Sequence, residues 1–353
     1  MGRTGNSLNP ISMTSRYSID MNRDRDISPP RKVAGVDAGF HRRAWFDMLA
    51  RHCFSGQRVM ISEARIGSAS AFLPLVEEKG RLSSLSNYYS FSYAPIFEAI
   101  EKQEERENLT TQFAADLRRS QGRISLYPLI DDDDGMPDML RRAFAEAGWI
   151  AILTVEGSNH IIDVNGRKFA AYWKGRPGAL RSSVRRKGKS ARYRYEIHEQ
   201  MDTALWGEYF AIYAASWKEA EPYPDIVRAI AEEAGERGAL RLGILRDGDR
   251  AVAAQLWTIE GDTACIHKIA HDTSEDARSP GTLLSHHMFA HMIDIEKVFR
   301  IDYGTGNNAY KRDWMEHARP MLRLDCFNPA HPRQWLPALK TRISQLVGRA
   351  SYS

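Results

Sequence analysis

The order of secondary-structure elements predicted along the chain is what most constrains its fold. In each half, a helical apolar spacing comes before antiparallel strand patterns, and then a helix and a strand follow. A further helix or loop and a last strand complete each half. Gly67-Ser68 joins one strand pair, and Asp247-Gly248-Asp249 joins its counterpart. The matching order predicts an α/β (α+β) protein of two related units, each with a mixed central sheet flanked by helices.

Shifts in composition suggest the limits of these units. Residues 1–35 are rich in Arg, Ser and Asn and contain no apolar core of a signal peptide, so they are predicted to be a disordered tail. The first unit is placed at residues 36–173 and the second at residues 196–353. Residues 174–195 are predicted to form a basic linker between them.

The composition of the 353-residue chain favours a protein of the cytoplasm. Hydrophobic residues make up 43% and charged residues 27%, as in ordinary globular proteins. The apolar runs are far shorter than the ~20 residues of a membrane span. Three dispersed cysteines form no disulfide or zinc pattern, which predicts a reducing compartment. The net charge of +4 permits an anionic partner without requiring nucleic acid. The sequence carries no signal for an oligomeric state.

The most basic stretch is residues 174–194, with nine Lys or Arg and no acidic residue. It fits a solvated linker or an exposed helix. It also fits a positive collar around a phosphorylated or otherwise anionic ligand. Nucleic-acid binding is a third interpretation, although Tyr193 and Tyr195 are too few to indicate base stacking.

Two glycine-bearing turns lie within residues 266–314. Ser279-Pro280-Gly281 opens a predicted helix, where Ser can cap, Pro suits the first turn and Gly lets a ligand approach the backbone. Free amides and the helix dipole at such a start attract phosphates. Asp302-Tyr303-Gly304 ends a short predicted strand. The same Ser-Pro-Gly pattern also begins many helices that bind nothing.

Together these turns and their neighbours resemble a known family, the bacterial GNAT-like acyltransferases. The similarity is strongest in the branch associated with cellulose or exopolysaccharide biosynthesis. That branch is related to the peptidoglycan-bridge aminoacyl transferases, which also carry two GNAT-type units. The resemblance is clearest over residues 240–327. Its motifs are Lys268-Ile269-Ala270, Ser279-Pro280-Gly281-Thr282-Leu283-Leu284, Asp302-Tyr303-Gly304, Tyr310-Lys311 and Trp314.

The resemblance implies tandem GNAT-like units, with acetyl-CoA or another acyl-CoA as co-substrate in the second unit. The pyrophosphate loop of the family would then correspond to six residues here: Arg278, Ser279, Pro280, Gly281, Thr282 and Leu283. Of the usual loop signature, this chain keeps an Arg and one Gly. An acyl carrier protein or another acyl donor therefore stays open.

Acyl transfer to an amine needs a base for the amine and an acid for the leaving thiolate. Asp302 is the candidate base, and a capping or salt-bridging carboxylate is the alternative. Tyr310 is the candidate proton donor, or else an aromatic residue packed at a domain edge. His267 is a further candidate base, although a lone strand histidine more often belongs to a core. The candidate substrate-binding residues are Trp217, Gln255, Lys268 and Lys311.

No metal is expected, because His287 and His291 have ligand spacing but lack the glutamate of a zinc motif. The sequence thus predicts a cytoplasmic N-acyltransferase acting on an amine of a sugar, amino acid or envelope precursor. The amine would attack the donor directly, without a covalent enzyme intermediate. Two alternatives are an aminoacyl transferase that uses charged tRNA and a non-catalytic accessory protein of exopolysaccharide biosynthesis.

Overall fold

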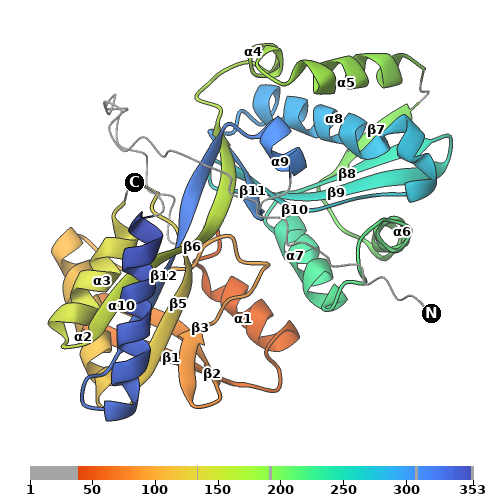
Figure 1. Cartoon of the computed structure of the whole chain (residues 1–353). Coiled ribbons are helices and arrows are strands. Elements are labelled where there is room, and N and C mark those ends of the chain that lie inside the picture. The colour runs from red at the N-terminus through yellow and green to blue at the C-terminus, as the bar shows by residue number, and fades with distance from the viewer. Residues whose placement is uncertain (1–38, 133, 191–192, 307–308, 351–353) are drawn as a thin grey trace, which may run out of the picture.

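The computed structural model describes residues 39–132, 134–190, 193–306 and 309–350 (Figure 1). The tail predicted at residues 1–35 lies outside the described residues. Within the described part, twelve strands form one sheet, in the order β1-β2-β3-β5-β12-β6-β11-β10-β9-β8-β7, with β4 paired to β2. Helices flank this sheet, so the predicted α/β class is confirmed.

The two halves of the chain supply the following elements. The first half contains α1 (Arg43–His52), β1 (Arg58–Ile66), β2 (Ala69–Glu78), β3 (Arg81–Ser84), β4 (Ile96–Glu98), α2 (Gln103–Arg118), β5 (Arg123–Leu129), α3 (Met136–Glu146) and β6 (Ile150–Asp163). The second half contains α4 (Phe169–Lys174), α5 (Gly178–Ser190), β7 (Tyr193–His198), α6 (Thr203–Ala214), α7 (Pro224–Glu236), β8 (Leu240–Asp247), β9 (Arg250–Glu260), β10 (Thr263–His271), the 3₁₀ turn η1 (Thr273–Arg278), α8 (Pro280–Asp294), β11 (Arg300–Thr305), α9 (Ala309–Trp314), β12 (His317–Phe327), the 3₁₀ turn η2 (Pro332–Gln334) and α10 (Trp335–Ala350).

The topology repeats between the halves and exchanges the last strand of each. In the first half an antiparallel meander, β1-β2-β3, is followed by α2, and β5 then runs parallel to β3. The second half repeats this with β8-β9-β10, α8 and β11. However, β5 pairs with β12 from the second half, while β11 pairs with β6 from the first. Because β12 and β6 also pair with each other, the sheet is continuous across both halves.

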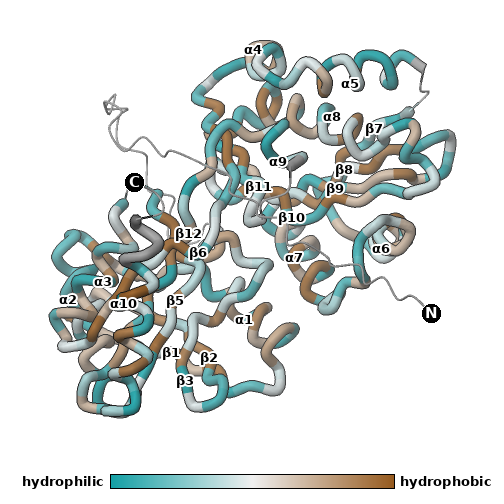
Figure 2. The backbone as a smooth tube through the Cα atoms, in the orientation of Figure 1, coloured by the Kyte–Doolittle hydropathy of each residue, from teal (hydrophilic) through white to brown (hydrophobic). Residues whose placement is uncertain are grey.

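Buried apolar residues lie along the strands of this sheet and on the helices that pack against it. Figure 2 shows hydrophobic residues concentrated along β8 and β9, and all six residues from Leu240 to Leu245 are buried. On α7, Ile226, Val227 and Ile230 face the core at helical spacing. One apolar cluster includes residues of both halves, from Phe40 through Leu324, so the two halves are packed as well as hydrogen-bonded together.

The basic stretch is ordered secondary structure. Residues 178–190 form α5, and strand β7 begins at Tyr193. Leu180 and Val184, four residues apart on α5, pack against the cluster that contains Leu283 and Leu284 of α8. An exposed helix was one of the interpretations that the sequence left open for this stretch, and the few apolar residues among its many charges did not decide between a helix and a linker.

Candidate functional site

Strands β10 and β11 separate beyond a short parallel contact. They pair only between residues 263–265 and 300–302, although β10 continues to His271 and β11 to Thr305. The pairing of β10 with β9 shifts register between Ile266 and Lys268, which is a β-bulge at His267. Because of the bulge and the loss of pairing, β10 and β11 diverge towards their C-terminal ends. These diverging ends are called the strand edge below.

The start of α8 lies at the same edge, and no side chain of the described residues caps it. Pro280 occupies its first turn, and Ser279 before it has φ 52°. The Lys187 ammonium of α5 donates a hydrogen bond to Ser279 Oγ. In the first half, α2 starts differently, because Glu105 accepts hydrogen bonds from two backbone amides at its N-terminus. The positive end of α2 is therefore neutralised by its own side chain, whereas that of α8 has a lysine beside it.

Several predicted residues meet at the first turn of α8. Gln255 is buried, and its Nε2 donates to Gly281 O at 3.1 Å and to Ser285 Oγ at 2.7 Å. A Cβ on Gly281 would lie 2.8 Å from His271 Nδ1, so only glycine fits against this ring. The exposed Trp217 packs against His271, and the centroids of the two rings are 4.6 Å apart. Gln255 is thus a clamp on the helix start, and Trp217 lies beside it.

Arg278 does not reach this group of side chains. Its guanidinium lies 2.6 Å from Asp247 Oδ2 and 3.4 Å from Glu275 Oε2 at the protein surface. Two hollows of about 380 and 370 Å³ in the described residues also lie elsewhere. One is beside α1 and α7, and the other is beside α6 and the start of η1. Neither of these two hollows is lined by the first turn of α8.

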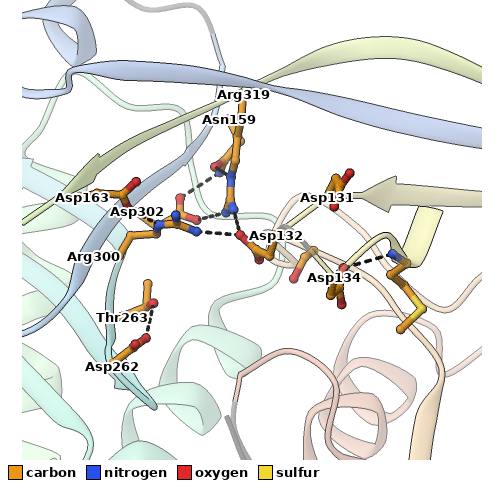
Figure 3. Close-up of polar contacts among 12 residues, drawn as sticks. Asp131, Asp132, Asp134, Asn159, Asp163, Asp262, Thr263, Arg300, Asp302 and Arg319 are labelled. Carbon is orange, nitrogen blue, oxygen red and sulfur yellow. Dashed lines mark hydrogen bonds and ion pairs between the residues drawn. The ribbon is translucent and has the colours of Figure 1, made fainter. Parts of the chain in front are cut away.

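Asp302 is the centre of a buried hydrogen-bond network (Figure 3). Its Oδ1 accepts hydrogen bonds from Asn159 Nδ2 at 2.8 Å and from the Gly304 amide at 2.7 Å. Its Oδ2 accepts from Arg319 Nη2 at 3.0 Å. The residue is 3% exposed, and its carboxylate is compensated by the cation on β12. Sequence reasoning selected Asp302 but not Asn159 or Arg319, which come from the exchanged strands.

The network continues through two arginines and two further carboxylates. Asp132 forms ion pairs with both Arg319 and Arg300, the latter at 2.6 Å. Arg300 also pairs with Asp163 at 2.6 Å. These residues lie on β6, β11, β12 and the segment after β5, as Figure 3 shows. The chain of opposite charges fixes the four segments relative to one another.

Lys311 and Tyr310 close the turn after β11. Lys311 Nζ donates to Tyr303 O at 3.0 Å and to Thr305 O. Burial lowers the pKa of Lys311 to about 8, even though Asp302 raises it. Tyr310 is 38% exposed, and its ring meets that of Tyr303 edge-on with centroids 5.8 Å apart. Lys311 therefore stabilises the turn, and Tyr310 is a partly exposed residue beside it.

His267 has the surroundings of a core histidine. Its Nε2 lies 2.9 Å from Thr258 Oγ1, and its ring packs against Phe91 at a centroid distance of 5.2 Å. Burial, with a contribution from Lys268, lowers its pKa to about 3. Imidazole with so low a pKa is a weak base, because it gains little by accepting a proton.

Lys268 belongs to a polar cluster that sequence reasoning did not find. Its Nζ lies 2.5 Å from Glu221 Oε2, and Glu221 Oε1 accepts hydrogen bonds from Tyr88 OH at 3.1 Å and from Tyr89 OH. These contacts connect a Tyr-rich segment of the first half to β10. Lys218 lies nearby, and burial and Lys268 lower its pKa to about 8. In the sequence, this polar cluster is indicated by the Tyr- and Ser-rich composition of residues 82–93.

No group of His, Cys, Asp and Glu among the described residues is arranged to hold a metal ion. His287, one of the histidines with ligand spacing, instead stacks on Tyr195 with ring centroids 4.6 Å apart.

Comparisons with known proteins identify the fold of this site. Residues 178–312 match the sequence model of a family described as an acetyltransferase (GNAT) domain. This stretch contains α8, β10 and β11, so the GNAT-like fold predicted for the second half is confirmed, and the domain type is that of an acyltransferase. A search among curated proteins finds no match to the chain.

Solved structures extend the likeness over both halves. The C-terminal domain of a putative lysylphosphatidylglycerol synthetase from Agrobacterium fabrum is 15% identical with a TM-score of 0.55, covering 86% of this chain and 90% of that one. FemX is 10% identical with a TM-score of 0.59, covering 85% and 94%. L-PGS from Bacillus licheniformis is 11% identical with a TM-score of 0.51, covering 81% and 89%. At these identities the likeness is one of fold.

Proposed function

We propose that the chain is a GNAT-type N-acyltransferase that moves an acyl group from an acyl-CoA to an amine of a sugar, amino acid or envelope precursor. A role in exopolysaccharide biosynthesis, suggested by the sequence resemblance, is part of the proposal. The observation that carries it is the uncapped start of α8 at the edge where β10 and β11 separate. Lys187 adds a positive charge at that point.

The first turn of α8, at the donor end of the proposed site, has the features of a phosphate-binding helix start. Backbone amides in the first turn of a helix have no intrahelical partner and, with the helix dipole, attract anions. Ser279, Gly281 and Thr282 are each partly accessible there. Arg278, which was predicted to bind the phosphates, pairs with Asp247 instead. Lys187 would therefore supply the positive charge opposite the phosphates. The acyl group would then extend into the gap between the two strands.

In the proposed reaction the amine nitrogen attacks the thioester carbonyl, the C–N bond forms and the C–S bond breaks. The amine loses a proton, and the leaving thiolate gains one. Among the described residues, Asp302 Oδ2 accepts a hydrogen bond from Arg319, and the second lone pair of this oxygen is the proposed acceptor of the amine proton. The phenol of Tyr310, a residue that is 38% exposed, is the proposed donor to sulfur. Trp217 and Lys268 would contact the acceptor, and Gln255 and Lys311 would hold the backbone around it.

Ligand-induced stabilisation tests the donor. A donor at about a hundred times its dissociation constant stabilises a protein by about 2.7 kcal/mol, which raises Tm by roughly 4 °C for a chain of this size. We expect this from acetyl-CoA or a longer acyl-CoA, and expect Lys187→Gln to remove most of it. Lys174→Gln, the same charge change at an exposed position on α4, should keep the full shift. If no CoA species stabilises the chain, the acyl-CoA proposal fails.

The test of the chemistry is Asp302→Asn, assayed with a donor that binds. The proposal expects turnover to disappear while the donor still raises Tm. Unchanged turnover would eliminate Asp302 as the base. Binding of a donor without any transfer to a panel of amines would favour the non-catalytic accessory protein.

A second candidate, aminoacyl transfer from charged tRNA, is favoured by the exposed face of α5. Arg185, Arg186 and Lys189 are exposed there, and they form no ion pair within the described part of the chain. One of the similar structures is titled as a domain of a putative lysylphosphatidylglycerol synthetase, a name that joins a lysyl group to a lipid. This candidate predicts that tRNA binds, that binding weakens steeply with salt, and that Arg185→Gln with Arg186→Gln reduces both affinity and salt dependence.

A further inference from the structure

Helix α10 exposes an apolar face to solvent. The side chains of Trp335, Leu336, Leu339 and Ile343 are 59%, 61%, 56% and 52% exposed. At about 100° per residue these positions lie on one side of the helix. Single exposed apolar residues are ordinary, but four large ones on one helix face mark an interaction surface.

The opposite side of α10 fixes the helix to the sheet. Ala338 is buried against Ile152 and Phe327. Gln345 Nε2 donates to Leu153 O at 2.7 Å, and in Figure 1 α10 lies across β6 and β12. The indole of Trp335 is itself held by a 2.9 Å hydrogen bond to Pro329 O. The apolar face is therefore presented outward by a docked helix.

The charged residues of α10 and of the turn before it are all basic. Arg333, Lys340 and Arg342 are exposed, and the sequence contains no acidic residue after Asp325. By the same rotation of about 100° per residue, Lys340 and Arg342 flank the apolar face on its two sides. An apolar strip with bulky Trp, Leu and Ile, bordered by cations, is typical of helices that lie in the interface of an anionic bilayer.

We propose that α10 docks the protein on a membrane surface that contains anionic lipid. The apolar side chains would enter the boundary between headgroups and acyl chains, while the flanking cations meet lipid phosphates. The helix would lie in the plane of the membrane. None of the helices in the described residues is long and apolar enough to cross a bilayer. A second copy of the chain fits this face less well, because pairing two such helices brings together two sets of cations without a carboxylate.

Vesicle co-sedimentation of the full chain tests the proposal. We expect binding to vesicles of equal parts phosphatidylglycerol and phosphatidylcholine, and at least tenfold less to phosphatidylcholine alone. Leu339→Glu with Ile343→Glu should abolish binding. Ile61→Glu is the matched control, because Ile61 is 51% exposed and lies on β1, which four strands separate from β6, the strand that Gln345 of α10 contacts. That variant should bind as the unaltered chain does.

The charge contribution has its own readout. Each cation near an anionic surface adds about 1 kcal/mol, so Lys340→Gln with Arg342→Gln should weaken binding by roughly 25-fold at low salt. Binding that is equal for both vesicle types, or unaffected by Leu339→Glu with Ile343→Glu, would overturn the proposal. So would light scattering that shows a dimer which those two substitutions dissociate, because the face would then belong to a second copy.

Discussion

The pairing of Asp302 with Arg319 leads to a quantitative prediction about the buried network. Asp302→Asn keeps the size of the side chain, and the new amide oxygen can still accept from Asn159 and Gly304. Its amide nitrogen, however, would face the Arg319 guanidinium, which now lies 3.0 Å from Asp302 Oδ2. The substitution thus removes a charge-assisted hydrogen bond and places two donors together.

The magnitude follows from the burial and from the remaining partner of Arg319. Breaking a buried ion pair costs about 3–5 kcal/mol when the other charge is left uncompensated. Here Asp132 still pairs with Arg319, whose side chain is 15% exposed. A loss near that of one charged hydrogen bond is therefore expected, about 2–3 kcal/mol for Asp302→Asn and for Arg319→Gln. The double variant should lose about 1.5–2 kcal/mol less than the sum, because the pair is broken only once.

Urea unfolding followed by circular dichroism and by tryptophan fluorescence measures these values. The control cycle uses Arg228 and Glu232, a solvent-exposed pair on α7 with side chains 38% and 44% exposed. Its coupling should be about 0.3–0.5 kcal/mol, as for other i,i+4 pairs. If the Asp302 and Arg319 substitutions are additive within about 0.5 kcal/mol, the ion pair does not have the strength that its geometry implies.

Three further substitutions test the strand edge. In thermal unfolding, Gly304→Ala should destabilise the protein by about 1–3 kcal/mol more than Gly248→Ala. Both glycines have positive φ, but only at Gly304 would the new Cβ lie 3.0 Å from another side chain, the ring of Phe91. Equal effects would contradict this packing. Lys218→Met should stabilise at pH 7, because the folded pKa of about 8 lies below the unfolded value and the charged lysine opposes folding. That gain should fade between about pH 8 and 10.5 in a pH series of Tm, and a constant gain would refute it. The unaltered chain should lose stability as pH falls from 6.5 towards 3, because unfolded His267 binds a proton in this range and folded His267 does not. His267→Gln should lose less stability over the same range. Equal acid profiles of the two proteins would show that His267 titrates normally.

Local pattern was sufficient for most of the fold. Period-two alternation and the Gly67-Ser68 turn predict the β1–β2 hairpin, whose register runs without a shift from Arg58 with Glu77 to Ile66 with Ala69. The predicted repeat of element order was also correct, because each half builds a meander, a crossover helix and a parallel strand. Local pattern does not explain residues 157–160 of β6, Gly-Ser-Asn-His, which form a strand by pairing with β12 and, from Asn159 on, with β11.

The candidate site depended on contacts that no local pattern contains. Asp302 stands out in the sequence because it ends an apolar strand, but its partners Asn159 and Arg319 lie 143 and 17 residues away. Lys187 appears in the sequence as one cation among nine, and only the packing of α5 on α8 distinguishes it. His267 shows the converse, because a strand histidine near a cleft and one inside a core look the same in sequence.

The exchange of final strands explains why the site requires both halves of the chain. The region that matches the GNAT domain ends at residue 312, before Arg319 on β12, and Asn159 on β6 precedes its start. That region alone would hold Asp302 in a buried position without its cation or its amide donor, a costly arrangement for a carboxylate. The same exchange places β12 between β5 and β6, where its far end supports α10 through Phe327. One strand thus neutralises the proposed catalytic carboxylate and, at its other end, anchors the helix proposed to meet the membrane. A substitution in the middle of β12 is therefore expected to disturb both properties, although the two sites share no side chain.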